Sequence, residues 1–154
     1  MSGNAPEIAL PQLPHARVAI ISSSWHVDIC SDLIAGAQRA LAAAAIKNVE
    51  VIYVPGSFEI PLASQIAFEK GFDAVVAVGL VLEGQTPHFD YVCQGVTQGV
   101  MDVSLKFSAP IGFGVLMCNT LDQAVARSGR PGSSEDKGYD SAVAAIKSLE
   151  LKAK

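Results

Sequence analysis

Four short polar stretches carry most of the side chains that could do chemistry in this chain of 154 residues. They occupy residues 22–26, 55–59, 83–88 and 118–120, and each follows an apolar run. Between them they hold hydroxyls, two carboxylates, two histidines and the only tryptophan. Such groups can bind a small polar substrate and move its protons, provided that the fold brings them together.

The stretch 83–88 combines the features of an anion site with a helix start. Thr86 and Pro87 predict a helix with Thr86 as N-cap and Pro87 as its first residue. Gly84 lets the backbone approach a ligand closely, so Gly84, Gln85 and Thr86 form a candidate phosphate cradle at the positive end of the helix dipole. Helix capping alone would also explain the Thr-Pro pair.

Four further residues fit a site for a small polar substrate with a flat ring. His88 falls in the first helical turn, where the dipole favours a neutral imidazole that can accept a proton, although it could also only hydrogen-bond the turn. Trp25, at a strand end, is either a stacking platform for a planar heterocycle or a core residue that closes the sheet end. Ser57 and Glu59 could hydrogen-bond a polyol or an amide edge, although a glutamate there also complements a helix dipole.

Arg127 and Lys137 flank the last turn and could bring positive charge to a phosphate, although cations on surface helices are usually only solvated. No metal-ligand spacing connects the three histidines, and the three cysteines lack a C-x-x-C pair, so no metal site is expected. The motifs of P-loop, dinucleotide-binding, serine-hydrolase and zinc-protease sites are missing from the sequence. A small phosphorylated substrate and a flat ring remain as the candidate ligands.

Apolar runs and helical patterns alternate along the chain. Strands are predicted at 17–22, 49–54, 73–82 and 111–117, and helices at 28–45, 58–70, 87–107, 120–128 and 135–151. This alternation implies a parallel sheet with helices on both faces, so we predict a flavodoxin-like, three-layer α/β/α sandwich with a four-stranded parallel sheet. Ligands bind beyond the carboxyl ends of such strands, where the four polar stretches should meet.

The length fits one domain, predicted over residues 15–154, after an N-terminal arm over residues 1–14 that contains three prolines. Residues 8–10 could add a strand to a neighbouring subunit or belong to a disordered tail. Half of the residues are hydrophobic and only 17% are charged, which suggests a buried subunit interface. The net charge of -4, without a run of Lys or Arg, argues against nucleic-acid and membrane partners. Residues 1–16 lack the pattern of a signal peptide, so a cytoplasmic protein is expected.

Several longer motifs resemble the 6,7-dimethyl-8-ribityllumazine synthases. They are VPGSFEIP at 54–61, GQTPHFDYV at 84–92, FGVL at 113–116, DQA at 122–124 with Arg127, and KG at 137–138. Their order agrees with the family from residue 17 to residue 151. The segments Ser-Ser-Trp-His and Ser-Glu-Asp-Lys-Gly are similar to those of the actinobacterial branch.

The resemblance implies a transferase of the penultimate step of riboflavin biosynthesis. It would condense 5-amino-6-(D-ribitylamino)uracil with 3,4-dihydroxy-2-butanone 4-phosphate to 6,7-dimethyl-8-ribityllumazine, releasing phosphate and water, without a metal or organic cofactor. The alternative is a non-catalytic lumazine or flavin carrier. The resemblance also implies a homo-oligomer with active sites at subunit interfaces, and the turn 130–136, longer than in shell-forming relatives, favours a pentamer.

The resemblance further implies a role for each site residue. The pyrimidine would stack on Trp25 and lie along Val81 and Leu82, and the ribityl chain and ring would be held by Ser57, Phe58 and Glu59. Phosphate would bind to Gly84, Gln85, Thr86 and Arg127, and His88 would move protons. Phe113 and Lys137 would reach in from the adjacent subunit. The sequence departs from the family at Glu83, where Arg or Lys is common, and we expect this carboxylate to point away from the cleft.

Overall fold

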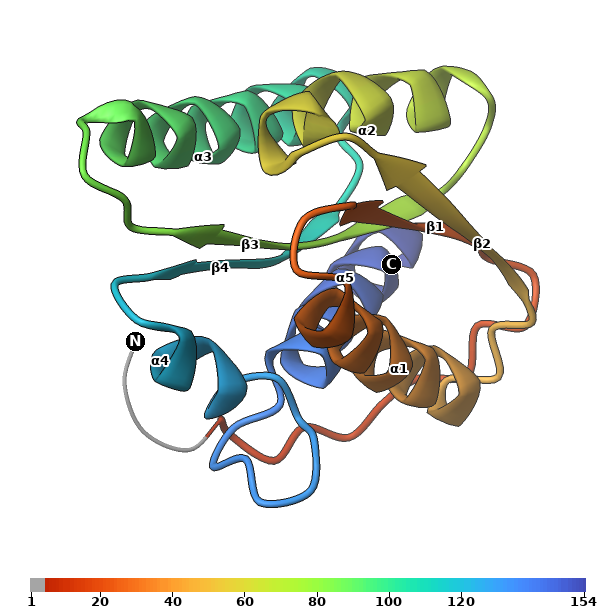
Figure 1. Cartoon of the computed structure of the whole chain (residues 1–154). Coiled ribbons are helices and arrows are strands. Elements are labelled where there is room, and N and C mark those ends of the chain that lie inside the picture. The colour runs from red at the N-terminus through yellow and green to blue at the C-terminus, as the bar shows by residue number, and fades with distance from the viewer. Residues whose placement is uncertain (1–4) are drawn as a thin grey trace.

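Runs of valine, isoleucine and alanine form a four-stranded parallel sheet at the centre of the protein (Figure 1). In the computed structural model, which describes residues 5–154, the strands are β1 (Arg17–Ser23), β2 (Asn48–Val54), β3 (Ala74–Leu82) and β4 (Ile111–Cys118). All three strand pairs are parallel and the order is β2-β1-β3-β4. The predicted sheet and its four strands are confirmed.

Helices cover both faces of this sheet (Figure 1). α1 (Val27–Ala43) and α5 (Lys137–Ala153) pack on one face, and α2 (Ile60–Glu69) and α3 (His88–Phe107) pack on the other. A 3₁₀ turn, η1 (Ser57–Glu59), precedes α2, and the short helix α4 (Leu121–Val125) follows β4. The three-layer, flavodoxin-like α/β/α sandwich is therefore the observed fold.

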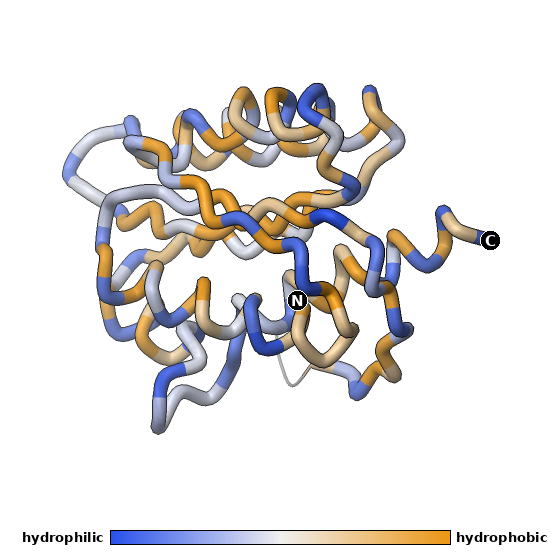
Figure 2. Tube along the Cα trace, turned by 90° about the vertical axis from the view of Figure 1, so that its right-hand side faces the viewer, coloured by the Kyte–Doolittle hydropathy of each residue, from blue (hydrophilic) through white to orange (hydrophobic). Residues whose placement is uncertain are grey.

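Two hydrophobic cores lie between the layers because successive strand residues point to opposite faces. Val18 and Ile20 of β1 belong to the core under α1 and α5, whereas Ala19 and Ile21 belong to the core under α2 and α3. The first seven residues of β3 are buried, as expected for a central strand covered on both sides. Figure 2 shows this concentration of hydrophobic residues between the helical layers.

The predicted helices differ from the observed ones at their ends, most clearly in three cases. The helix predicted at 58–70 begins as the turn η1, and α2 has Pro61 in its first turn, where the missing N–H of proline costs nothing. The helix predicted at 120–128 ends already at Val125. The last helix starts at Lys137 rather than at residue 135, because the side chain of Asp136 caps it by accepting a hydrogen bond from the Tyr139 amide at 3.0 Å.

The described part of the arm, residues 5–14, forms neither helix nor strand. Its second half lies against its own domain: the Leu13 amide donates to the Ala44 carbonyl at 2.8 Å, and the Gln12 side chain donates to the Ala43 carbonyl at 3.0 Å. Leu13 also packs on the core under α1. The pairing of residues 8–10 with a neighbouring subunit stays a prediction, and residues 1–4 of the predicted arm lie outside the described residues.

Candidate active site

A cleft opens where the order of the sheet reverses. β1 connects outward to β2 while β3 connects outward to β4, and parallel sheets bind ligands beyond the carboxyl ends of the strands at such a point. The cleft has a volume of about 760 Å³ and lies between the ends of β1, β2 and β3 and the first turns of α3. Nine of the predicted site residues line it: Trp25, Ser57, Phe58, Glu59, Val81, Leu82, Gly84, Thr86 and His88.

Three of the four polar stretches therefore meet, and the fourth does not. Asn119 and Thr120 are absent from the lining of the cleft. They are engaged at the start of α4 instead, where the Thr120 hydroxyl caps the helix by accepting from the Gln123 amide at 3.4 Å, and the Asn119 amide donates to the Gln123 side chain at 2.8 Å. The prediction that all four stretches share one site is wrong for residues 118–120.

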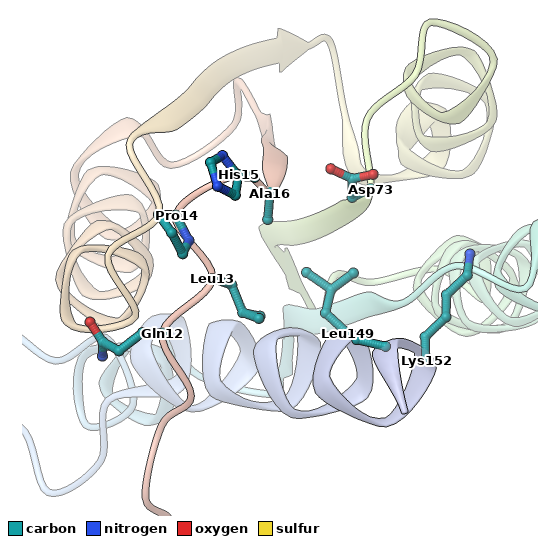
Figure 3. Close-up of a pocket in the computed structure, with 9 residues that line it drawn as sticks. Gln12, Leu13, Pro14, His15, Ala16, Asp73, Leu149 and Lys152 are labelled. Carbon is teal, nitrogen blue, oxygen red and sulfur yellow. The ribbon is translucent and has the colours of Figure 1, made fainter.

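A second hollow, of about 440 Å³, lies at the opposite end of the sheet, where β1 and β3 begin (Figure 3). It is formed by the arm and the end of α5, and its polar side chains include His15, Asp73 and Lys152. It contains none of the predicted site residues. The candidate chemistry is therefore concentrated in the larger cleft.

Trp25 presents its ring to the larger cleft, at the ends of the strands, and is not a core residue. The residue is 68% exposed, which decides between the two interpretations that the sequence left open. The turn that places it depends on His26, which has the left-handed φ of 53° before α1 begins. The indole Cδ1 atom comes within 3.7 Å of the point where Gly56 would carry a Cβ, so the ring stands against the β2 end of the cleft.

Ser57 carries a buried hydroxyl at the wall of the cleft. Only 6% of the residue is exposed, and its Oγ atom has no hydrogen-bond partner among the described residues. It fits there because Gly79 of β3 lacks a side chain: a Cβ on Gly79 would come within 2.7 Å of the Ser57 Oγ. Glu59, by contrast, already accepts a hydrogen bond from the Gly56 amide at 2.9 Å, which stabilises η1 and fixes one of its oxygens.

The loop before α3 differs from the prediction in one respect. The helix begins at His88 with Pro87 as N-cap, and the Thr86 hydroxyl makes no capping hydrogen bond, so the prediction of Thr86 as the N-cap is wrong. Within residues 5–154, the backbone amides of Gly84, Gln85 and Thr86 donate no hydrogen bond. They precede a helix of 20 residues whose positive end attracts anions. Gln85 is exposed in this loop but does not line the cleft.

Arg127 and Lys137 lie side by side, away from the cleft of their own chain. The Lys137 amide donates to the Arg127 carbonyl at 3.0 Å, and the carboxylate of Glu135 contacts both side chains. The Lys137 ammonium holds the pKa of Glu135 below its ordinary value, and Glu135 in turn raises the pKa of Lys137. Phe113, on the outer strand β4, is 42% exposed and also lies outside the cleft.

Comparison with known proteins decides the family. The family model for 6,7-dimethyl-8-ribityllumazine synthase matches residues 15–153. The chain belongs to the 6,7-dimethyl-8-ribityllumazine synthase family. It is 49% identical over 147 residues to the 6,7-dimethyl-8-ribityllumazine synthase of Streptomyces coelicolor, covering 95% of this chain and 91% of the relative. It is also 49% identical over 152 residues to that of Pseudarthrobacter chlorophenolicus, covering 95% and 94%.

These two relatives agree with the likeness to actinobacterial lumazine synthases that the sequence motifs indicated. Among solved structures, a de novo designed Rossmann fold protein matches with a TM-score of 0.41 and 17% identity, covering 70% of this chain and 90% of the designed chain, and this distant likeness adds nothing to the assignment. Residues 5–154 hold no group of three His, Cys, Asp or Glu side chains suited to a metal, and none of the helices there could cross a membrane.

Glu83, the departure from the lumazine synthase pattern, does not line the cleft. The Asn119 side chain donates to its carboxylate at 2.5 Å, and the Glu83 amide donates to the Cys118 carbonyl at 2.9 Å. Both contacts turn the residue toward the loop after β4. The expectation that this carboxylate points away from the cleft agrees with its contacts.

Sequence reasoning missed several residues that line the cleft. Two of them, Tyr91 and Val92, follow His88 by three and four positions, so they share its face of α3. This spacing was available from the sequence once His88 had been placed in a helix. Leu80 and Phe89 were missed as well, whereas His26, Pro55 and Gly56 lie in the predicted polar stretches but had no role assigned to them.

Proposed function

We propose that this chain condenses 5-amino-6-(D-ribitylamino)uracil with 3,4-dihydroxy-2-butanone 4-phosphate to form 6,7-dimethyl-8-ribityllumazine, phosphate and water. The observation that carries the proposal is the gathering of Trp25, Ser57 and His88 in one cleft of a lumazine synthase family member. A stacking surface, a hydrogen-bonding group without a partner and a proton carrier are what joining a flat ring to a ketone requires.

The pyrimidine substrate occupies the part of the cleft between β1, β2 and β3. Its ring stacks on the exposed indole of Trp25 and lies along Val81 and Leu82. The Ser57 hydroxyl is buried in the wall without a partner among the described residues, and it rotates toward the cleft to hydrogen-bond the substrate. The exposed Phe58 and Glu59 border the ribityl chain. Buried polar groups without partners are costly, so a ligand that satisfies Ser57 is favoured.

The phosphorylated substrate binds at the start of α3. The free amides of the Gly84, Gln85 and Thr86 loop and the positive end of the helix attract its phosphate. His88, the first residue of α3, then lies beside both substrates. It moves protons as the ring amine attacks the ketone and a first water is lost, as phosphate leaves, and as a second water is lost on ring closure. We assign this transfer about 10²- to 10⁴-fold of the acceleration, with the rest coming from holding the two substrates together.

Arg127 and Lys137 bring positive charge to the phosphate in the cleft of a neighbouring subunit, and Phe113 reaches into the same cleft. Arg127 and Lys137 belong to one cluster that does not line their own cleft, so any neighbour that receives Lys137 receives Arg127 as well. The active form is therefore a homo-oligomer, which we propose to be a cytoplasmic pentamer. Its interfaces cover exposed apolar side chains such as Tyr91 and Leu105, which are 69% and 71% exposed in the single chain.

The test follows lumazine formation by its absorbance after the purified protein is mixed with both substrates. The uncatalysed condensation is subtracted. We expect rapid formation in the wild type, a rate lowered by about 10²- to 10⁴-fold in His88→Ala, and an unchanged rate in the matched variant His15→Ala, whose histidine lies in the second hollow. No acceleration over background, with the ribitylaminouracil still bound, would indicate a non-catalytic lumazine or flavin carrier instead.

A further inference from the structure

Glu135 is a charged residue to which the proposed reaction gives no role. Its carboxylate lies between the two cations that we assign to phosphate: Oε1 is 3.8 Å from the Arg127 Nε, and Oε2 contacts the Lys137 Nζ. The Glu135 side chain is only 17% exposed, compared with 40% for Arg127. A carboxylate held there fills space that an incoming anion would occupy, and it neutralises part of the positive charge that would attract that anion.

The backbone holds this arrangement in place. Residues 126–129 and 135–137 run side by side, with an antiparallel bridge between Ser128 and Asp136. The Glu135 amide donates to the Ala126 carbonyl at 3.0 Å, and the Gly129 amide donates to the Glu135 carbonyl at 3.0 Å. In an extended segment alternate residues share one side. Glu135 therefore faces the same way as the two cations, whereas Asp136 contacts Arg39 of α1.

The cluster is close to neutral as a result. Lys137 has a second carboxylate, Asp140, with an oxygen 3.5 Å from its Nζ, so two cations face two anions. Arg127 is less engaged with carboxylates than Lys137. Its Nη1 donates to the Gln123 carbonyl at 2.9 Å, but its only carboxylate contact in the described part of the chain, with Glu135 at 3.8 Å, is longer than a hydrogen bond. Arg127 thus remains able to take an anion, but against the field of the adjacent carboxylate.

We propose that Glu135 is a built-in counter-anion that weakens the phosphate subsite and thereby speeds release of the phosphate produced. This inference rests on the proposed function. A site with Arg127 and Lys137 alone would bind orthophosphate tightly and retain the product. Glu135 offsets part of that attraction, and its contacts with the two cations form again when phosphate leaves. The lowered pKa of Glu135 keeps the carboxylate charged near neutral pH.

The test measures the dissociation constant of radiolabelled orthophosphate by equilibrium dialysis, which needs no turnover. Glu135→Gln keeps the size of the side chain and removes its charge. We expect it to bind orthophosphate on the order of tenfold more tightly than the wild type, and orthophosphate to inhibit lumazine formation more strongly in the variant. Asp140→Asn, which relieves only Lys137, should tighten binding by less. Glu150→Gln is the matched control, because Glu150 contacts Lys147 on α5 and makes the same change in net charge.

An orthophosphate affinity of Glu135→Gln that is unchanged or weaker than that of the wild type would overturn the proposal, as would equal tightening in Glu150→Gln. Circular dichroism verifies that each variant is folded, and Glu135→Ala provides the same comparison if Glu135→Gln does not fold. If the wild type forms lumazine but Glu135→Gln shows no tightening, only this inference fails. If the wild type neither forms lumazine nor binds orthophosphate, the proposed function fails together with it.

Discussion

Replacing Ser57 by alanine should stabilise the protein and weaken its binding of substrate. The Ser57 hydroxyl is buried without a partner among the described residues, and such a group costs a fold about 1–3 kcal/mol. Ser57→Ala removes the oxygen and leaves the backbone of η1 unchanged. We expect the free energy of unfolding to rise by about 1 kcal/mol, which for a chain of 154 residues raises the melting temperature by about 2–4 °C.

The same variant should lose one hydrogen bond to the pyrimidine substrate. A neutral hydrogen bond contributes about 0.5–1.5 kcal/mol, so the KM for ribitylaminouracil should rise roughly 2- to 10-fold. Ser104→Ala is the matched control: its half-buried hydroxyl donates to the Ala109 carbonyl at 2.7 Å, far from the cleft, so its loss should lower the melting temperature and leave KM unchanged. Calorimetry and initial rates measure both effects. A melting temperature of Ser57→Ala that falls as in Ser104→Ala, or an unchanged KM, would refute the reasoning.

Three further changes have defined outcomes. Gly79→Ala places a Cβ 2.7 Å from the Ser57 Oγ and should lower the free energy of unfolding by about 1–3 kcal/mol in denaturant titrations, a loss that adding Ser57→Ala should largely reverse; an unrecovered loss would place the clash elsewhere. Glu83→Arg should leave the KM for the butanone phosphate unchanged, and a large fall would show that residue 83 faces the cleft after all. Lys137 lowers the pKa of Glu135 from its ordinary 4.5, so the stability that the Glu135 carboxylate contributes is present above pH 4.5 and is lost as the pH falls through the lowered value. The stability difference between wild type and Glu135→Gln should therefore shrink on acidification in acid-unfolding curves, and a difference that grows would contradict this sign.

The fold could be predicted because its signals are local. Each strand is a short run rich in apolar residues, many of them β-branched, and each long helix carries a helical pattern, so the strand–helix alternation alone implied the parallel sheet. Helix ends were less predictable. Pro87, for example, has φ of −63° and ψ of −5° as the residue before the helix, and this conformation resembles that of a first helical residue, so the sequence could not tell whether Thr86 or Pro87 is the N-cap.

The site could be predicted only in part, because burial and long-range pairing decide the rest. A tryptophan at a strand end fits both a core and a cleft, and only its 68% exposure shows that Trp25 faces the cleft. The contact of Arg127 with Glu135 and Lys137 depends on the bridge between residues 128 and 136, which no local pattern indicates. Family motifs predicted Arg127 and Lys137 as site residues, but their separation from the cleft of their own chain appears only in the structure.

Co-assembly of two impaired variants tests most directly whether lumazine is made in a cleft that a neighbouring subunit completes. Trp25→Ala damages the cleft and Arg127→Ala damages the cluster, so each variant alone should form lumazine slowly. If both are unfolded, mixed in equal amounts and refolded together, roughly a quarter of the sites should combine an intact cleft with an intact neighbouring cluster, and the rate should recover toward a quarter of the wild-type rate. A rate for the mixed assemblies equal to the mean of the two separate variants would contradict the composite site.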